Sequence, residues 1–265
     1  MPENLDDRPG PALPAINRRR FIIRAAGGAA ALSLAGCDDA LSNSSWVPRI
    51  LDKAETLTAA VQRAIAGPQS LAREYTAADI STDFKANGTT DPDDDDYRKL
   101  AENDFADWKL QVGGLVDLPL SLSLTELRAM PARTQITRHD CVEGWSCIGE
   151  WTGAKMAALV GLAGLKKQAK HIVLYCADTL GGSKYYETLD VVDVVHPQTI
   201  LAYEMNGGPL TVPHGAPLRL RAEHYLGYKQ AKYVMRLEAV DRFDHIGGGQ
   251  GGYWEDRGYD RFGGI

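Results

Sequence analysis

The sequence predicts an α+β fold with mixed sheets around a single core. Short runs rich in Val, Ile, Leu and Tyr recur along the chain, at residues 108–112, 133–139, 171–176, 185–189, 200–205, 218–221 and 232–237. Turn-forming stretches such as Asn206-Gly207-Gly208-Pro209 separate these runs, and helix-start signals are few. Strands broken by occasional short helices are typical of an α+β domain. With 265 residues, 44% of them hydrophobic, the chain can form one sizeable core plus extensions.

Local signals assign several elements. The capping-box pattern at residues 123–126 predicts a short helix that runs through residue 130. A possible cap at Thr152 predicts a helix over residues 152–159, and apolar residues at helical spacing predict another over residues 48–65. Residues 87–96 combine turn-forming residues with an acidic run, which predicts a solvated loop.

The N-terminus carries the pattern of an export signal. Consecutive arginines at residues 18–20 precede an apolar run from Ala25 to Ala35, which is too short to span a bilayer. The run ends at Leu34-Ala35-Gly36-Cys37, which resembles a bacterial lipoprotein signal-peptidase box with Cys37 as the acylated residue. We therefore expect twin-arginine export to the periplasm and a lipid anchor at Cys37. Asp38 resembles the signal that keeps such lipoproteins on the inner membrane.

These features divide the chain into three parts. Residues 1–36 are expected to form a twin-arginine signal peptide with a lipobox, and residues 37–104 a linker helix with an N-terminal extension. Residues 105–265 are expected to form the catalytic domain. The alternative for the first part is an amphipathic or buried N-terminal helix.

Charge and cysteine usage exclude several classes of protein. The net charge is −6 and the body of the chain lacks a basic block, which argues against nucleic-acid binding. The four cysteines are Cys37, Cys141, Cys147 and Cys176, and none forms a CxxC pair. Their spacing does not fit a zinc ribbon or a disulfide-rich mini-domain. A Cys147–Cys176 disulfide stays open because the expected compartment is oxidising.

Cys141 is the strongest candidate for a reactive residue. It follows Arg138-His139-Asp140 directly and precedes a Gly-Trp turn. Positive charge from Arg138 and His139 would favour the thiolate. A thiolate can ligate a soft metal centre or act as a nucleophile. Taken alone, Cys141 would more simply be a buried structural cysteine.

Two downstream cations are candidates for binding an anionic ligand. Arg219 follows Pro213-His214-Gly215-Ala216-Pro217-Leu218, and Lys232 ends Tyr228-Lys229-Gln230-Ala231-Lys232. An arginine can bind a phosphate through two parallel hydrogen bonds, and a lysine can bind it as a point charge. Taken singly, each cation is more simply explained as an ordinary surface charge.

Taken together, these motifs resemble a known family. The segments are Arg138-His139-Asp140-Cys141-Val142-Glu143-Gly144-Trp145-Ser146, Asn206-Gly207-Gly208-Pro209-Leu210, His214-Gly215-Ala216-Pro217-Leu218-Arg219 and Tyr228-Lys229-Gln230-Ala231-Lys232. In kind and order they resemble the oxidoreductase molybdopterin-binding domain of the sulfite-oxidase family. The resemblance covers roughly residues 105–260. It extends to exported members such as the catalytic subunit of the periplasmic protein-methionine-sulfoxide reductase.

The resemblance implies a molybdenum–molybdopterin (Mo-MPT) cofactor and a set of residues that hold it. Cys141 would supply the protein thiolate to molybdenum. His214, Arg219 and Lys232 would contact the pterin or its phosphate, and Gln230 and Ala231 belong to the same contacting segment.

Two further contacts follow less directly from the family pattern. Cys176 or its neighbour Ala177 lies near a position where the family often has Thr. Asn87 and Lys85 are the candidates for the family's N-terminal cofactor contacts.

The implied chemistry is oxygen-atom transfer, in the direction of sulfoxide reduction or of sulfite oxidation. Arg138 is the expected cationic group nearest the reacting oxygen, and His139 would orient or balance the charge of the site. The sequence has no haem-attachment CxxCH and no iron–sulfur cysteine set, so we expect electron exchange with a membrane haem or quinone-linked subunit. The resemblance also predicts a monomeric subunit with no C-terminal dimerisation domain.

Two other functions stay open. A cysteine-dependent hydrolase or thiol oxidoreductase could use Cys141 with His139 or His214, since positions 139 and 141 of a strand face the same side. A non-catalytic envelope lipoprotein could keep the fold as a binding module, although the intact Cys141 argues against it.

Overall fold

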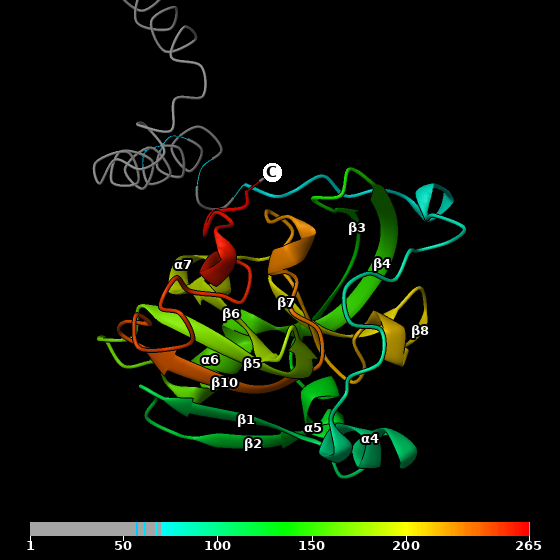
Figure 1. The fold of residues 1–265 in the computed structure, drawn as a ribbon. Coiled ribbons are helices and arrows are strands. Elements are labelled where there is room, and N and C mark those ends of the chain that lie inside the picture. Colours follow the sequence, from blue (N-terminus) through cyan, green and yellow to red (C-terminus); the bar gives the residue numbers. More distant parts are fainter. Residues whose placement is uncertain (1–56, 58–60, 62–66, 68–69, 265) are drawn as a thin grey trace, which may run out of the picture. The chain divides into compact units, whose positions relative to one another are not determined.

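Two five-stranded sheets form the framework (Figure 1). The computed structural model describes residues 70–264 and the single positions 57, 61 and 67. The first sheet has the order β2-β1-β10-β5-β6. Its strands are β1 (Lys109–Gly114), β2 (Leu120–Ser123), β5 (His171–Leu180), β6 (Ser183–Asp190) and β10 (Val234–Val240). The β1–β10 pair is parallel and the other pairs are antiparallel, so this sheet is mixed.

The second sheet is antiparallel and carries the segment that leads to Cys141. Its strands are β3 (Ala132–Asp140), β4 (Ser146–Lys155), β7 (Ile200–Met205), β8 (Gly208–Pro209) and β9 (Arg219–Arg221), with β9 paired to β7. The helices are short: α4 (Asp95–Glu102), α5 (Leu124–Arg128), α6 (Met156–Ala163) and α7 (Val191–Val194). Single 3₁₀ turns are η1 (Ala77–Asp79), η2 (Val212–His214), η3 (Gly227–Lys229) and η4 (Glu255–Arg257). The predicted α+β class with mixed sheets is confirmed.

The capping-box prediction is also confirmed. The Ser123 hydroxyl accepts a hydrogen bond from the Glu126 N–H at 3.3 Å. The Glu126 carboxylate accepts one from the Ser123 N–H at 2.8 Å. This exchange satisfies two backbone donors at the start of α5, which is why the chain leaves β2 directly into a helix.

Two local predictions are wrong. Residues 152–155 continue β4 because they pair with β7, where Ala154 lies opposite Leu201, and the helix begins only at Met156. The predicted loop at residues 87–96 is wrong only at its end, because it stops at Asp94 and α4 begins at Asp95. Asp94 caps this helix by accepting a hydrogen bond from the Tyr97 N–H at 2.8 Å. The helix expected over residues 48–65 falls outside the described residues apart from positions 57 and 61.

The main core lies among the first sheet, α6 and the inner strands of the second sheet. Part of the expected N-terminal extension belongs to the same packed body. Phe84 packs against Trp151, and Tyr97 packs against Tyr233 and donates a hydrogen bond to the Ala216 carbonyl at 2.7 Å. Within the described range, none of the helices has the length and apolar character needed to cross a membrane.

Candidate active site

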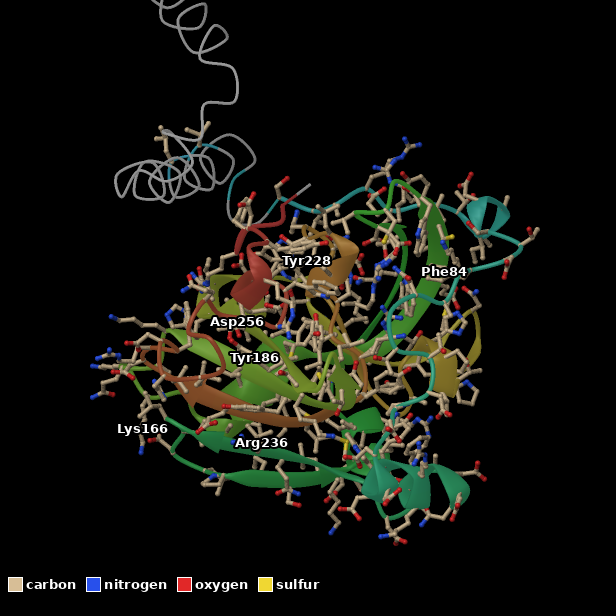
Figure 2. All side chains as sticks on the ribbon, viewed as in Figure 1. Phe84, Lys166, Tyr186, Tyr228, Arg236 and Asp256 are labelled. Carbon is tan, nitrogen blue, oxygen red and sulfur yellow. The ribbon has the colours of Figure 1, made fainter. Side chains whose placement is uncertain are left out.

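Cys141 opens into a cavity of about 480 Å³. Its wall comes from segments far apart in sequence, including the loop at residues 84–89, the turn after β3 and the segment that contains η3. Phe84 and Tyr228, both labelled in Figure 2, are two of the lining residues. Cys141, His214, Arg219 and Lys232 all line this one cavity, so two of the three motifs after residue 200 join the Cys141 motif there. The motif at residues 206–210 does not line it.

A tight turn presents the Cys141 thiol. The Cys141 N–H donates to the Trp145 carbonyl at 2.9 Å, and the Gly144 N–H donates to the Cys141 carbonyl at 3.0 Å. Gly144 has a φ of +84°, a conformation that glycine adopts without strain. The Asn87 side-chain amide donates to the Cys141 sulfur at 3.3 Å. The structure therefore brings Asn87, from the N-terminal loop, into direct contact with the thiol.

His139 and Arg138 face opposite sides of β3, as successive strand residues do. His139 is buried and lines the cavity. Burial, followed by the positive charges of Arg221, Arg219 and Lys232, lowers the pKa of His139 well below its usual range, so the imidazole is neutral. Arg138 lies outside the cavity, and half of its side chain is exposed while its Nε donates to Asp140 at 2.9 Å.

The expectation that Arg138 is the nearest cation is therefore wrong. The buried Arg219 and the partly buried Lys232 supply the positive charge at this cavity instead. The premise that Arg138 and His139 both place positive charge beside the thiol also fails, because one side chain faces away and the other is neutral.

Arg219 is a buried guanidinium with unused donor capacity. It lies over the Trp151 ring, 4.8 Å from the centroid, and its Nη1 donates to the His214 carbonyl at 2.9 Å. Its Nε has no hydrogen-bond partner among the described residues. Burial and the nearby Arg221 lower the pKa of Arg219 to about 9, so the group still carries its charge at neutral pH.

Lys232 holds the N-terminal loop in place. Its ammonium donates to the carbonyls of Asn87 at 2.8 Å and Pro213 at 2.9 Å, and also to that of Thr89. Burial and the charge of Arg219 lower the pKa of Lys232 to about 7. The two cations are desolvated and repel each other. An anionic ligand bound in the cavity would reduce this repulsion and stabilise both charges.

Two of the remaining predicted residues line the cavity with their polar atoms already engaged. His214 pairs through Nε2 with the Phe84 carbonyl at 3.0 Å and through Nδ1 with the Thr211 hydroxyl at 2.9 Å. Gln230 exchanges hydrogen bonds with both backbone groups of Ala222 and also donates to the Tyr225 carbonyl. These two side chains therefore stabilise the backbone segments that form the cavity wall.

Cys176 and Ala231 lie outside the cavity, contrary to the prediction. Both are buried in the main core cluster. Cys176 lines a second cavity instead, and burial raises the pKa of its thiol well above the usual value. The three described cysteines, Cys141, Cys147 and Cys176, are all free thiols, so the structure contains no Cys147–Cys176 disulfide.

Asp178 is a lining residue that the sequence prediction missed. Burial raises the pKa of its carboxyl to about 6, and its Oδ1 has no hydrogen-bond partner among the described residues. It stands two positions after Cys176, at the end of an apolar β run. An acidic residue that directly follows an apolar strand sequence is the signal that could have identified it.

Comparison with known proteins identifies the family. A family profile described as "Oxidoreductase molybdopterin binding domain" matches residues 98–245. The chain is 36% identical over 252 residues to a protein of Azospira oryzae named "Putative protein-methionine-sulfoxide reductase subunit YedZ1", covering 95% of this chain and 88% of that protein. It is 32% identical over 157 residues to "Uncharacterized oxidoreductase YuiH" of Bacillus subtilis, covering 59% and 74%.

Two further similarities are partial. The chain is 32% identical over 146 residues to the protein-methionine-sulfoxide reductase catalytic subunit MsrP of Xanthomonas axonopodis pv. citri. That match covers 51% of this chain and 45% of MsrP, so the chain spans about half of that protein's length. The sulfane dehydrogenase SoxCD of Paracoccus pantotrophus matches in structure with a TM-score of 0.47 at 25% identity, covering 52% and 39%.

The resemblance to the sulfite-oxidase type of molybdopterin domain is confirmed by the match over residues 98–245. The chain therefore belongs to the oxidoreductase molybdopterin-binding family, and it is a molybdopterin-dependent oxidoreductase.

Proposed function

We propose that this chain is an exported molybdenum–molybdopterin enzyme that removes the oxygen atom of a sulfoxide, with methionine sulfoxide in proteins as its substrate class. The observation that carries the proposal is the convergence, in one cavity, of the Cys141 thiol with two cations, the buried Arg219 and the partly buried Lys232. The names of the relatives in Azospira and Xanthomonas support the choice of a sulfoxide over sulfite.

The residues at the cavity fit the cofactor. Cys141 would supply the single protein ligand to molybdenum, and Asn87 donates a hydrogen bond to the same sulfur. Arg219, whose Nε is unpaired among the described residues, and Lys232 would hold the anionic phosphate end. Asp178 offers a buried carboxyl to the N–H groups of the pterin. When bound, the cofactor supplies two-electron redox chemistry at molybdenum.

The protein's own groups bind, orient and exclude water. Lys232 fastens the loop at residues 87–89 against Pro213, which closes one wall of the cavity. Phe84, Trp145 and Tyr228 provide aromatic surface around the opening. Such a surface suits an apolar thioether product and its sulfoxide precursor.

A cysteine-dependent hydrolase is the weaker proposal. A base beside Cys141 would need a free nitrogen lone pair, but the Nδ1 lone pair of His139 accepts from Arg221 at 3.0 Å. Both ring nitrogens of His214 are also engaged. Neither histidine is therefore placed to accept the thiol proton.

Sulfoxide reduction consumes two electrons, and we propose that a membrane haem or quinone-linked subunit supplies them. The word "subunit" in the name of the Azospira relative supports such a partner. Export by the twin-arginine route and a lipid anchor at Cys37 remain proposals, because both fall on residues outside the described range. Mass spectrometry of the mature N-terminus from the native host tests them, with a diacylated Cys37 as the expected first residue.

The activity test uses the molybdenum-loaded, full-length protein with a reduced viologen dye as electron donor. We expect oxidation of the dye when methionine sulfoxide, free or within an oxidised protein, is added. Sulfite with an oxidising dye is the comparison. Turnover of sulfite and none of any sulfoxide would contradict the proposed direction of the reaction.

A further inference from the structure

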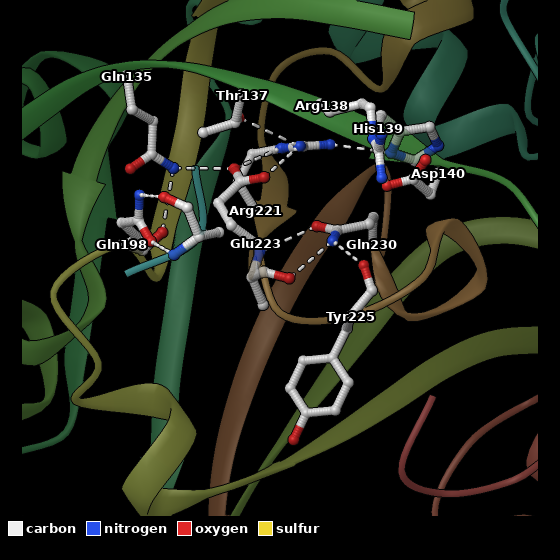
Figure 3. A network of polar contacts seen from close by, with 12 residues as sticks. Gln135, Thr137, Arg138, His139, Asp140, Gln198, Arg221, Glu223, Tyr225 and Gln230 are labelled. Atoms are coloured by element: carbon white, nitrogen blue, oxygen red, sulfur yellow. Dashed lines mark hydrogen bonds and ion pairs between the residues drawn. The ribbon is translucent and has the colours of Figure 1, made fainter. Parts of the chain in front are cut away.

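A buried hydrogen-bond network underlies His139 (Figure 3). Arg221 is fully buried, and its Nη1 lies 3.0 Å from His139 Nδ1. Its Nε and Nη2 donate to the two carboxylate oxygens of Glu223, at 2.9 and 2.5 Å. The Gln135 amide donates to the same carboxylate at 2.8 Å. Glu223 and Gln135 are buried as well, so solvent does not compete for these bonds.

This network fixes the tautomer of His139. A guanidinium group has only donors, so His139 Nδ1 must accept the hydrogen bond from Arg221. A nitrogen that accepts a hydrogen bond carries no proton, so the ring proton resides on Nε2. The bidentate pair with Glu223 holds the Arg221 guanidinium plane, which in turn holds the imidazole ring.

The Nε2 side of His139 lies beside Gly227, and both residues line the cavity. His139 is only 7% exposed, yet it lines the cavity wall together with Gly227. Among the described residues, no group accepts a hydrogen bond from His139 Nε2. A Cβ atom added at Gly227 would lie 2.7 Å from that nitrogen, so any side chain at this position would cover the Nε2 edge.

We propose that His139 donates a hydrogen bond through Nε2–H to the oxygen atom of the substrate, and that Arg221, Glu223 and Gln135 are positioning residues that keep this donor in place. The inference rests on the proposed function and names the group that recognises the sulfoxide oxygen. Since Nδ1 is always occupied by Arg221, the ring presents the same donor before, during and after the reaction.

The chemistry suits a fixed donor. In the overall reaction the S–O bond breaks, sulfur gains two electrons from the redox partner, and the oxygen leaves as water with two protons from solvent. Negative charge grows on the oxygen as that bond breaks, so a preorganised N–H stabilises the transition state more than the bound substrate. His139 donates a hydrogen bond in this scheme and transfers no proton.

The first test is nuclear magnetic resonance of the molybdenum-loaded full chain with ¹⁵N-labelled histidine. The His139 signals are assigned with the His139→Gln variant. We expect a proton on Nε2 and none on Nδ1, and we expect the Nε2 signal to shift when methionine sulfoxide is added. A proton on Nδ1 would overturn the proposal. An Nε2 signal that does not shift when a sulfoxide that the enzyme reduces is added would also overturn it.

The second test compares variants at equal molybdenum content. His139→Leu removes the donor and should lower kcat about a hundredfold or more, whereas His139→Gln keeps an N–H near the same place and should lose much less. Arg221→Lys should yield both His139 tautomers in the ¹⁵N spectrum and a lower kcat. Arg236→Lys, an exposed arginine on β10, is the matched control and should leave the tautomer and kcat unchanged.

Gly227→Ala probes the same nitrogen without replacing a residue of the network. Its Cβ would displace the His139 ring, so we expect a lower kcat and an altered Nε2 signal. Gly161→Ala is the control, because its Cβ meets no atom within 4 Å. The proposed function would be wrong if the molybdenum-loaded wild type reduced no sulfoxide. Failure of this inference would be a wild type that reduces sulfoxide and a His139→Leu variant with the same kcat.

Discussion

Of the two cations at the cavity, Arg219 is buried and Lys232 is partly buried. Among the described residues, their charged ends donate to backbone carbonyls and make no ion pair with a carboxylate. Nearby Asp178 only partly offsets the effect of burial and of Arg219 on Lys232. The charged form of Lys232 is therefore destabilised in the folded protein. This destabilisation is the consequence of placing two cations where an anion can bind.

This imbalance predicts a pH dependence of stability for protein produced without its cofactor. The folded chain releases the Lys232 proton near pH 7, whereas the unfolded chain keeps it up to about 10.5. Between these values the unfolded state binds more protons, so the contribution of Lys232 makes the folded state more stable as pH rises. Urea unfolding at a series of pH values should give a slope in this window that is larger in the wild type than in Lys232→Gln. Equal slopes would contradict the assignment.

The site residues that could be predicted from sequence stand in local motifs, whereas those that were missed depend on tertiary contacts. Cys141, Arg219 and Lys232 stand in local motifs, so their roles could be predicted. Arg221 could not, because its importance arises from pairing with His139 and Glu223 once β9 lies on β7 and near β3. Arg138 was misassigned because adjacency in sequence places it on the outer face of the strand.

Among the elements, a buried ionic cluster joins β6, η3 and η4. The Lys229 ammonium contacts the carboxylates of Glu187 at 2.5 Å and of Glu255, and all three side chains are buried. Although burial opposes the charged form, the two carboxylates raise the pKa of Lys229. The cluster thus fastens η4, and with it Trp254, to the segment that lines the cavity.

Removing the central charge should be strongly destabilising. Lys229→Met would leave two carboxylates buried without a cation, and we expect the free energy of unfolding to fall by about 3–5 kcal/mol. The matched control is Lys99→Met, which breaks the exposed Lys99–Asp96 pair and should leave the free energy of unfolding nearly unchanged, because solvent screens this pair. Denaturant titration of both variants measures the difference. A Lys229→Met variant as stable as the control would show that the cluster contributes little.

The local signals that succeeded and failed also differ in kind. The capping box at the start of α5 is satisfied within four residues, so its sequence pattern was sufficient. The start of α6 depends on how far β4 pairs with a strand that begins about fifty residues later, at Ile200, and no local pattern reports that pairing. The end of the acidic run, Asp95 and Asp96, joins α4, in which Tyr97 gains a buried site against Tyr233.

For the whole molecule, the α+β class and the convergence of motifs on one cavity were predictable, because both follow from strand patterns and from a family resemblance. The division into two sheets was not, since it depends on the single parallel pairing of β1 with β10 and on the separate packing of β3 and β4. The loop at residues 84–89 also joins the active site only through tertiary contacts, through Lys232 and the Asn87–Cys141 hydrogen bond.

The most direct test of this account is the molybdenum content of purified, natively exported protein, measured beside that of Cys141→Ser. The account predicts about one molybdenum per wild-type chain and its loss from the variant, with the fold retained in both. A folded wild type that contains no molybdenum, although made in a host that synthesises the cofactor, would contradict the central claim. So would a Cys141→Ser protein that retains the metal in full.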